Sequence, residues 1–121
     1  MHEISIAGAI IESVLDTAKK NNAKKVNEVF LEIGELTGLN PDQLRFIFKT
    51  ITNGSVAENA RYDIKVIKTL INCKKCSFNG PVEIFEMHHY FLPEIKCPGC
   101  GETDVEILAG RECNIKKIKI S

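Results

Sequence analysis

The first half of the chain shows two hydrophobic periods, one typical of helices and one typical of strands. Over residues 4–20 the apolar side chains recur at steps of three and four, which predicts a helix with one buried face. Residues 26–33 alternate with a period of two and are rich in β-branched and aromatic types, which predicts a strand. Asn40 and Pro41 suit the N-cap and first turn of a second helix, which Gly54 ends.

Extended segments dominate the second half. Residues 60–71 alternate and run into a first pair of cysteines as one strand, and further strands are expected at 81–85, 105–108 and 112–120. The order is therefore helix, strand, helix, strand, cysteine-rich insert and strand. We expect an α+β fold in which a small three-stranded sheet carries two helices on one face. Residues 1–70 with 110–121 would form this domain, and 71–109 the insert.

Composition and charge restrict the class of protein. The chain has 121 residues, 44% of them hydrophobic, with 16 basic and 16 acidic residues and a net charge of +0. A balanced charge argues against nucleic-acid binding through bulk positive charge. No apolar run reaches the ~18 residues of a membrane span, and the start lacks the basic region of a signal peptide. We therefore expect a cytoplasmic protein that binds neither nucleic acid nor membrane.

Four of the five cysteines form two CxxC pairs, Cys73 with Cys76 and Cys97 with Cys100. In a reducing compartment this spacing predicts a tetrahedral thiolate site for a metal rather than disulfides. Four thiolates saturate Zn(II) and leave no position for a reacting water, so the predicted role is a structural zinc ribbon. The fifth cysteine, Cys113, lies in an expected strand.

The turn of the second pair is visible in its residue types. Pro98 presets φ, and Gly99 and Gly101 tolerate left-handed backbone.

Two other classes of protein fit the same cysteines. A rubredoxin-like electron carrier would hold iron and shield it with aromatic side chains, for which the chain offers Phe78, Phe85, Tyr90 and Phe91. A zinc-ribbon interaction module, for example in transcription, would need exposed basic or aromatic residues, of which the ribbon has Lys74, Lys75, Phe78, Tyr90 and Lys96. An enzyme is not expected, because the sequence shows neither a nucleophile–base pair nor a Gly-rich phosphate loop.

Three histidines add nitrogen donors. His88 and His89 lie between the cysteine pairs, where an imidazole can supplement a metal site. The alternative is an ordinary loop histidine, since neighbours on an extended chain point to opposite faces. His2 follows the terminal amine, and the amine, the His2 amide and the imidazole can together reach one Ni(II) or Cu(II) ion. On the residues alone, a surface histidine without a role is the better explanation of His2.

A family resemblance distinguishes between these possibilities. The chain resembles the HypA/HybF family of hydrogenase nickel-incorporation proteins along its whole length. The resemblance rests on the start Met1-His2-Glu3-Ile4-Ser5-Ile6, the segments Leu31-Glu32-Ile33-Gly34-Glu35-Leu36 and Ala57-Glu58-Asn59-Ala60, and the cysteine pairs Cys73/Cys76 and Cys97/Cys100.

The resemblance implies a nickel metallochaperone that is not an enzyme. In the family, nickel is bound by the terminal amine of Met1 and by His2, with Glu3 nearby, and the four cysteines hold zinc. Residues 1–70 with 110–121 would then be a nickel-binding domain and 71–109 a zinc-binding domain. The implied partners are a HypB-type GTPase, the large subunit of [NiFe] hydrogenase and, in some organisms, urease maturation proteins. The loop that contains His88 and His89 resembles the longer-loop type, in which loop histidines add a metal contact.

The family often carries an acidic residue close to the loop before the second helix. This sequence has Asn40 there, followed by Asp42.

Overall fold

The computed structural model describes residues 3–82 and 95–121, which form two compact units. Unit 1 consists of the chain up to Glu32, Leu39–Lys65 and Cys113–Ser121, and unit 2 of Ile33–Gly38 and Val66–Glu112. The sequence pattern assigns residues 33–38 to the domain formed by residues 1–70 and 110–121. They cluster with unit 2 because the Gly34 amide donates to the Glu112 carbonyl, and the Leu36 amide to the Gly110 carbonyl.

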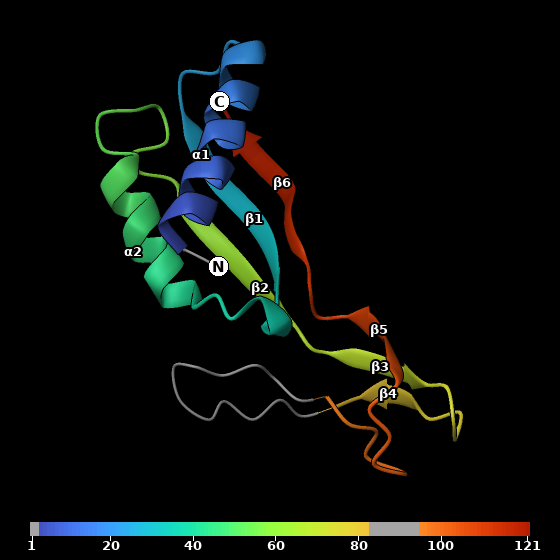
Figure 1. Ribbon diagram of the computed structural model, residues 1–121. Helices are drawn as coiled ribbons and strands as arrows, with labels where there is room; N and C mark the ends of the chain where they lie inside the picture. The colour runs from blue at the N-terminus through green and yellow to red at the C-terminus, as the bar shows by residue number, and fades with distance from the viewer. Residues whose placement is uncertain (1–2, 83–94) are drawn as a thin grey trace. The chain divides into compact units, whose positions relative to one another are not determined.

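Two helices and three strands make up most of unit 1 (Figure 1). The sheet has the order β2-β1-β6. The elements are α1 (Glu3–Lys20), β1 (Val26–Gly34), α2 (Pro41–Ile51), β2 (Arg61–Ile67) and β6 (Cys113–Ile120).

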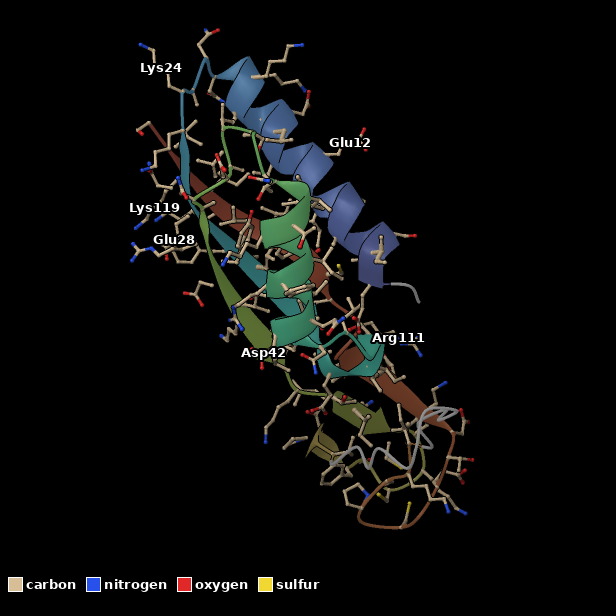
Figure 2. All side chains as sticks on the ribbon, turned by 90° about the vertical axis from the view of Figure 1, so that its left-hand side faces the viewer. Glu12, Lys24, Glu28, Asp42, Arg111 and Lys119 are labelled. Atoms are coloured by element: carbon tan, nitrogen blue, oxygen red, sulfur yellow. The ribbon has the colours of Figure 1, made fainter. Side chains whose placement is uncertain are left out.

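The two helices lie on one face of this sheet, as the fold prediction required (Figure 2). Side chains at helical spacing on α1, such as Val14, and on α2, such as Leu44 and Phe48, are fully buried. Val29 and Leu31 of the central strand are buried as well. The alternation in β1 thus separates a buried face from a half-exposed one.

The start of α2 shows why the second helix begins where the sequence predicts. The Asn40 side chain accepts hydrogen bonds from the amides of Asp42 and Gln43, at 2.9 and 3.1 Å. Pro41 occupies the first helical position, where no amide donor is needed. Asp42 places a negative charge in the first turn.

Unit 2 contains a second three-stranded sheet of order β4-β3-β5 with antiparallel pairs. Its elements are the short 3₁₀ helix Glu35–Thr37 and the strands β3 (Leu70–Cys73), β4 (Asn79–Pro81) and β5 (Val105–Ala109). The continuous strand predicted over residues 60–71 is wrong, because β2 ends at Ile67 and β3 belongs to this other sheet. The Thr69 amide between the two strands donates to the Glu35 carboxylate at 3.1 Å instead of to a sheet neighbour.

Two glycines allow the strands of unit 2 to meet segment 33–38. A Cβ on Gly34 would collide with the carbonyl group of Gly110. Gly110 itself has φ 121°, a conformation that side chains disfavour, and a Cβ there would lie 2.9 Å from the Thr69 hydroxyl. The glycine of the Leu31–Leu36 motif is therefore required by backbone contact.

Among the helices of the described residues, none combines the length and the apolar character that a membrane crossing requires.

Candidate metal centre

The four cysteines of the two pairs come together at one end of unit 2, as the sequence predicted. Their sulfur atoms all lie within 4.8 Å of one another. Sγ of Cys73 lies 3.7 Å from Sγ of Cys100, and Sγ of Cys76 lies 3.4 Å from Sγ of Cys97. Four sulfurs at the Zn–S distance of 2.3 Å from one tetrahedral ion would be about 3.8 Å apart. The spacing of the thiols thus fits a tetrahedral metal ion.

In both turns an amide points at the first sulfur, but it belongs to the third residue after that cysteine in one turn and to the second residue in the other. The Cys76 amide points at Sγ of Cys73, at 3.5 Å, and the Gly99 amide points at Sγ of Cys97, at 3.3 Å. In each turn the residue after the second cysteine has a left-handed backbone, with φ 64° at Ser77 and 76° at Gly101. Gly101 confirms the expectation from the sequence, whereas Gly99 does not have a positive φ.

Backbone hydrogen bonds join these turns to the strands. The Cys73 amide donates to the Phe78 carbonyl at 2.7 Å, and the Cys97 amide to the Glu102 carbonyl at 2.9 Å. Cys73 and Cys97 are each only 2% exposed, whereas Cys76 and Cys100 are exposed. One sulfur of each pair therefore faces the interior and the other faces solvent, which positions the cluster at the surface of the unit.

The thiols affect one another's pKa values. The Cys76 amide is the main cause that lowers the pKa of the Cys73 thiol to about 7. For Cys76 the Phe78 amide acts to lower the pKa, but the Cys97 thiol, burial and the other two thiols raise it to about 12. For Cys100 the Glu102 amide and the Cys76 thiol act to lower the pKa, but burial and the thiols of Cys73 and Cys97 raise it. Close thiols resist ionising together, and a divalent cation removes that repulsion.

Apolar residues enclose the inner side of the cluster. Ile71 and Val82 are buried against Cys73 and Cys97, and the partly buried side chains Phe78, Ile95 and Val105 pack on them. Phe78, a candidate aromatic shield or exposed docking residue from the sequence, is part of this small core. No pattern in the sequence marked Ile95 or Val105 as neighbours of the cysteines.

The basic residues of the first turn are paired with acids of the second. Lys74 lies 3.7 Å from Asp104, and Lys75 lies 3.8 Å from Glu102. The amides of Asp104 and Thr103, which donate to the Glu102 carboxylate, lower its pKa, and Lys75 adds to the effect. These exposed ion pairs are weak in energy, but they offset the positive charge that a nucleic-acid-binding ribbon would present.

The predicted nickel and auxiliary residues are described only in part. Glu3 is the first residue of α1, where a carboxylate suits the helix dipole. Met1, His2, His88 and His89 lie outside the described residues, as do Phe85, Tyr90 and Phe91. Cys113 is the first residue of β6 and is not part of the four-cysteine cluster.

Asn40, which stands where the family often has an acidic residue, uses its side-chain oxygen to cap α2.

Comparison with protein families decides what kind of protein carries this centre. Residues 1–120 match the family model described as "Hydrogenase/urease nickel incorporation, metallochaperone, hypA". The chain belongs to the HypA family. The family consists of metallochaperones and not enzymes, which confirms the predicted family and the predicted absence of catalysis.

Individual relatives cover nearly the whole chain. It is 48% identical over 120 residues to hydrogenase maturation factor HypA of Methanothermobacter thermautotrophicus, covering 99% of this chain and 97% of the relative. The HypA of Methanocaldococcus jannaschii is 37% identical over 125 residues, with the same coverage.

The fold is also similar to solved structures. The solution structure of the Ni metallochaperone HypA from Helicobacter pylori matches with a TM-score of 0.64 and 27% identity, covering 99% of this chain and 97% of that one. A second solution structure of a HypA protein gives a TM-score of 0.68 and 28% identity, covering 100% and 97%. The HypA family thus supplies the coarse function, which is nickel metallochaperone activity in hydrogenase maturation.

Proposed function

We propose that this HypA protein binds Ni(II) through the amine of Met1 and the imidazole of His2, with Glu3 nearby, and keeps Zn(II) in its four cysteines. The observation that supports this division is the cysteine cluster itself. Four sulfurs at tetrahedral spacing saturate a zinc ion and leave no coordination position for cargo. Nickel must then be carried elsewhere, and nitrogen donors suit Ni(II).

The four-cysteine site would hold zinc as a permanent part of the fold. Thiolates in tetrahedral geometry favour zinc or iron over nickel. In this proposal residues 71–109 are a zinc-binding domain, and residues 1–70 with 110–121 are a nickel-binding domain. His88 and His89 are proposed as an auxiliary metal contact from the segment between the cysteine pairs.

The delivery steps follow from family membership. We infer that the protein works in the cytoplasm with a HypB-type GTPase to supply nickel to the large subunit of [NiFe] hydrogenase, and that urease maturation proteins are further partners where urease is present. The family's description supports both enzyme systems, since it names hydrogenase and urease nickel incorporation. Nucleotide hydrolysis is assigned to the partner.

Substitution of His2 tests the nickel site. In zinc-loaded protein with its native start, His2→Ala should reduce nickel affinity at least about tenfold, which corresponds to a loss of about 1.4 kcal/mol of binding free energy. The variant should keep one zinc ion per chain. Isothermal titration with Ni(II), together with metal analysis, measures both quantities. A residue added before Met1 should act similarly, because it converts the amine into an amide, and Glu12→Ala on the exposed face of α1 is a matched control.

Acid provides a second readout of the same ligands. Amine and imidazole bind metal only when deprotonated, so nickel affinity should fall as the pH is lowered. Unchanged nickel affinity in both the His2→Ala protein and the extended protein would refute the assignment.

A further inference from the structure

The outer side of α2 forms a groove with the loop that precedes β2. Two adjoining depressions, of about 440 and 550 Å³, share Lys49, Glu58 and Asn59 in their lining. Both lie entirely within unit 1. Glu58 and Asn59 belong to the Ala57–Ala60 segment that resembles the family motif, and the proposed metal sites give that segment no role. We call this surface the α2 groove, lined chiefly by Arg45, Phe46, Lys49, Glu58, Asn59 and Tyr62.

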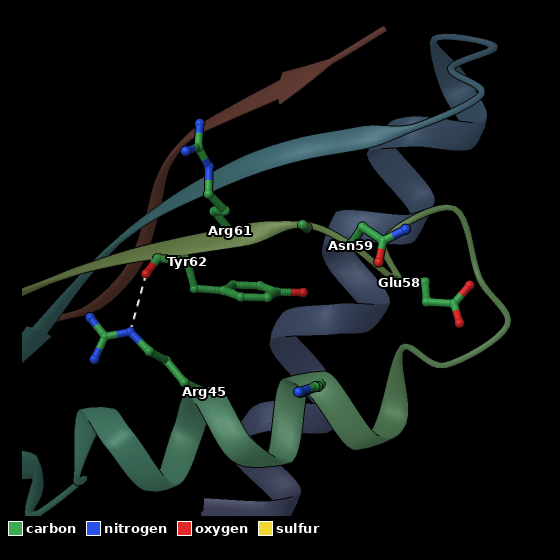
Figure 3. A pocket seen from close by; sticks show the side chains of 7 residues that line it. Arg45, Glu58, Asn59, Arg61 and Tyr62 are labelled. Atoms are coloured by element: carbon green, nitrogen blue, oxygen red, sulfur yellow. Dashed lines mark hydrogen bonds between the residues drawn. The ribbon is translucent and has the colours of Figure 1, made fainter.

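The groove has an ordered floor. The Tyr62 ring stacks on the buried Phe48 ring, with centroids 4.5 Å apart. Arg45 donates from Nε to the Tyr62 carbonyl at 3.2 Å, which joins α2 to β2 (Figure 3). The loop is held by the fully buried Ala57, and the Ala60 amide donates to the Ala57 carbonyl at 3.1 Å. A preformed surface of this kind costs little conformational entropy when a partner binds.

The α2 side of the groove is positively charged. Lys49 has no ion-pair partner among residues 3–82 and 95–121, and Arg45 is tied to the exposed Asp42 by only one guanidinium nitrogen, at 3.2 Å. Across the groove, Glu58 contributes one carboxylate and Asn59 one amide (Figure 3). Arg61 also lines the groove, but its guanidinium group lies 3.8 Å from the Glu28 carboxylate. Lys49 and Arg45 are thus available to an incoming carboxylate.

An exposed aromatic ring lies beside these cations. Phe46 is 68% exposed, although Leu44, Ile47 and Phe48 on the same helix are buried. It lines the second depression together with Lys49. Nothing in the packing of unit 1 requires a phenylalanine at this position. Exposed aromatic side chains next to arginine are typical of the centre of protein–protein interfaces.

We propose that the α2 groove docks a segment of a protein partner in which a carboxylate side chain lies next to an apolar one. The carboxylate would pair with Lys49 and Arg45, and the apolar side chain would cover Phe46. A nucleic acid fits less well, because the groove has only three cations, of which Arg61 is paired with Glu28, because Glu58 shares the lining, and because the net charge of the chain is +0. The inference is independent of where nickel binds.

Titration of zinc-loaded, ¹⁵N-labelled full-length protein tests this surface. The probe is the short peptide Gly-Ser-Asp-Leu-Glu-Leu-Ser-Gly. Its binding is monitored through the amide chemical shifts of residues 45–49 and 58–61. We expect saturable shifts there, and binding at least about tenfold weaker for peptides in which the acids become lysines or the leucines become serines.

Matched variants separate the groove from general surface effects. Lys49→Glu and Phe46→Ser should each weaken peptide binding about tenfold, with the remaining spectrum unchanged. Lys24→Glu makes the same charge change in the exposed α1–β1 turn, and Ile4→Ser removes another exposed apolar side chain, so both should bind like the parent. Equal weakening by Lys24→Glu, no saturable shift at residues 45–49, or tighter binding of a short RNA or inorganic phosphate to the same amides would overturn the proposal.

Discussion

The two compact units are stabilised in different ways. Unit 1 buries apolar side chains from both helices and from its central strand, for example Val14, Phe48 and Leu31. In unit 2 the main buried cluster within the described residues contains Ile71, Cys73, Val82 and Cys97, so half of its members are metal-ligand candidates. Such a small core cannot offset the conformational entropy of its chain without a further source of free energy. With Zn(II) in the four cysteines, as proposed above, unit 1 would fold by apolar burial and unit 2 by metal binding.

Loss of the metal should produce the largest difference between the units. Structural zinc contributes an apparent binding free energy of about 10–16 kcal/mol in small thiolate domains. Chelation, or Cys97→Ser, should therefore remove hydrogen-exchange protection from Ile71 and Val105 while Val29 and Leu31 stay protected. Cys113→Ser, outside the cluster, is the control and should retain zinc. Protection of Ile71 in metal-free protein would show that unit 2 does not need the ion.

A core substitution in unit 1 should destabilise that unit and leave the metal site unchanged. Phe48 is fully buried and stacks on Tyr62, so Phe48→Ala should lower the free energy of unfolding of unit 1 by about 3–5 kcal/mol. Zinc content should not change. Phe46→Ala on the exposed side of the same helix should stay within about 0.5 kcal/mol of the parent. Chemical denaturation followed by amide signals of α1 distinguishes the two variants, and similar losses would mean that burial does not control unit 1.

Backbone contact between two glycines is a smaller contribution inside unit 2. Gly34→Ala places a methyl group against the Gly110 carbonyl and should destabilise the zinc-loaded unit by about 1–3 kcal/mol. Gly8→Ala in α1 meets no neighbouring atom and should instead stabilise its helix by up to about 1 kcal/mol. Thermal melting of both variants measures whether the melting temperature falls for Gly34→Ala and rises for Gly8→Ala. A neutral Gly34→Ala protein would show that segment 33–38 is not packed as described.

The smallest expected effect concerns the helix cap of α2. Asn40→Ala removes the oxygen that accepts from Asp42 and Gln43 and should cost unit 1 about 1 kcal/mol, whereas Asn40→Ser should restore most of the loss. Nickel affinity of the Asn40→Ala protein should equal that of the parent, because the side chain is engaged in capping. A changed nickel affinity with unchanged stability would instead make Asn40 a ligand.

The regular elements could be predicted because their signals are local. The apolar stripe of residues 4–20, the alternation after Val26 and the cap at Asn40 each depend on neighbours in the sequence. The break between Ile67 and Leu70 was missed, since alternation continues through it and only a contact from Glu35 reveals the change of sheet.

The candidate sites, like the regular elements, could be predicted only where the signal is local in the sequence. The spacing of the four cysteines predicted their convergence, because each pair is closed by its own turn. The α2 groove could not be predicted, since Lys49 and Asn59 become neighbours only when the loop folds back on α2. The nickel assignment to Met1 and His2 rests on family membership and on the chemistry of the donors rather than on spacing.

X-ray absorption at two metal edges, on one sample loaded with both ions, tests the central claim most directly. We expect a zinc edge with four sulfur neighbours at about 2.3 Å and a nickel edge with nitrogen and oxygen neighbours and no sulfur. In the His2→Ala protein the zinc spectrum should be unchanged and the bound nickel should be lost. Sulfur at the nickel edge, or nickel retained by the variant with zinc displaced, would contradict the separation of cargo from scaffold.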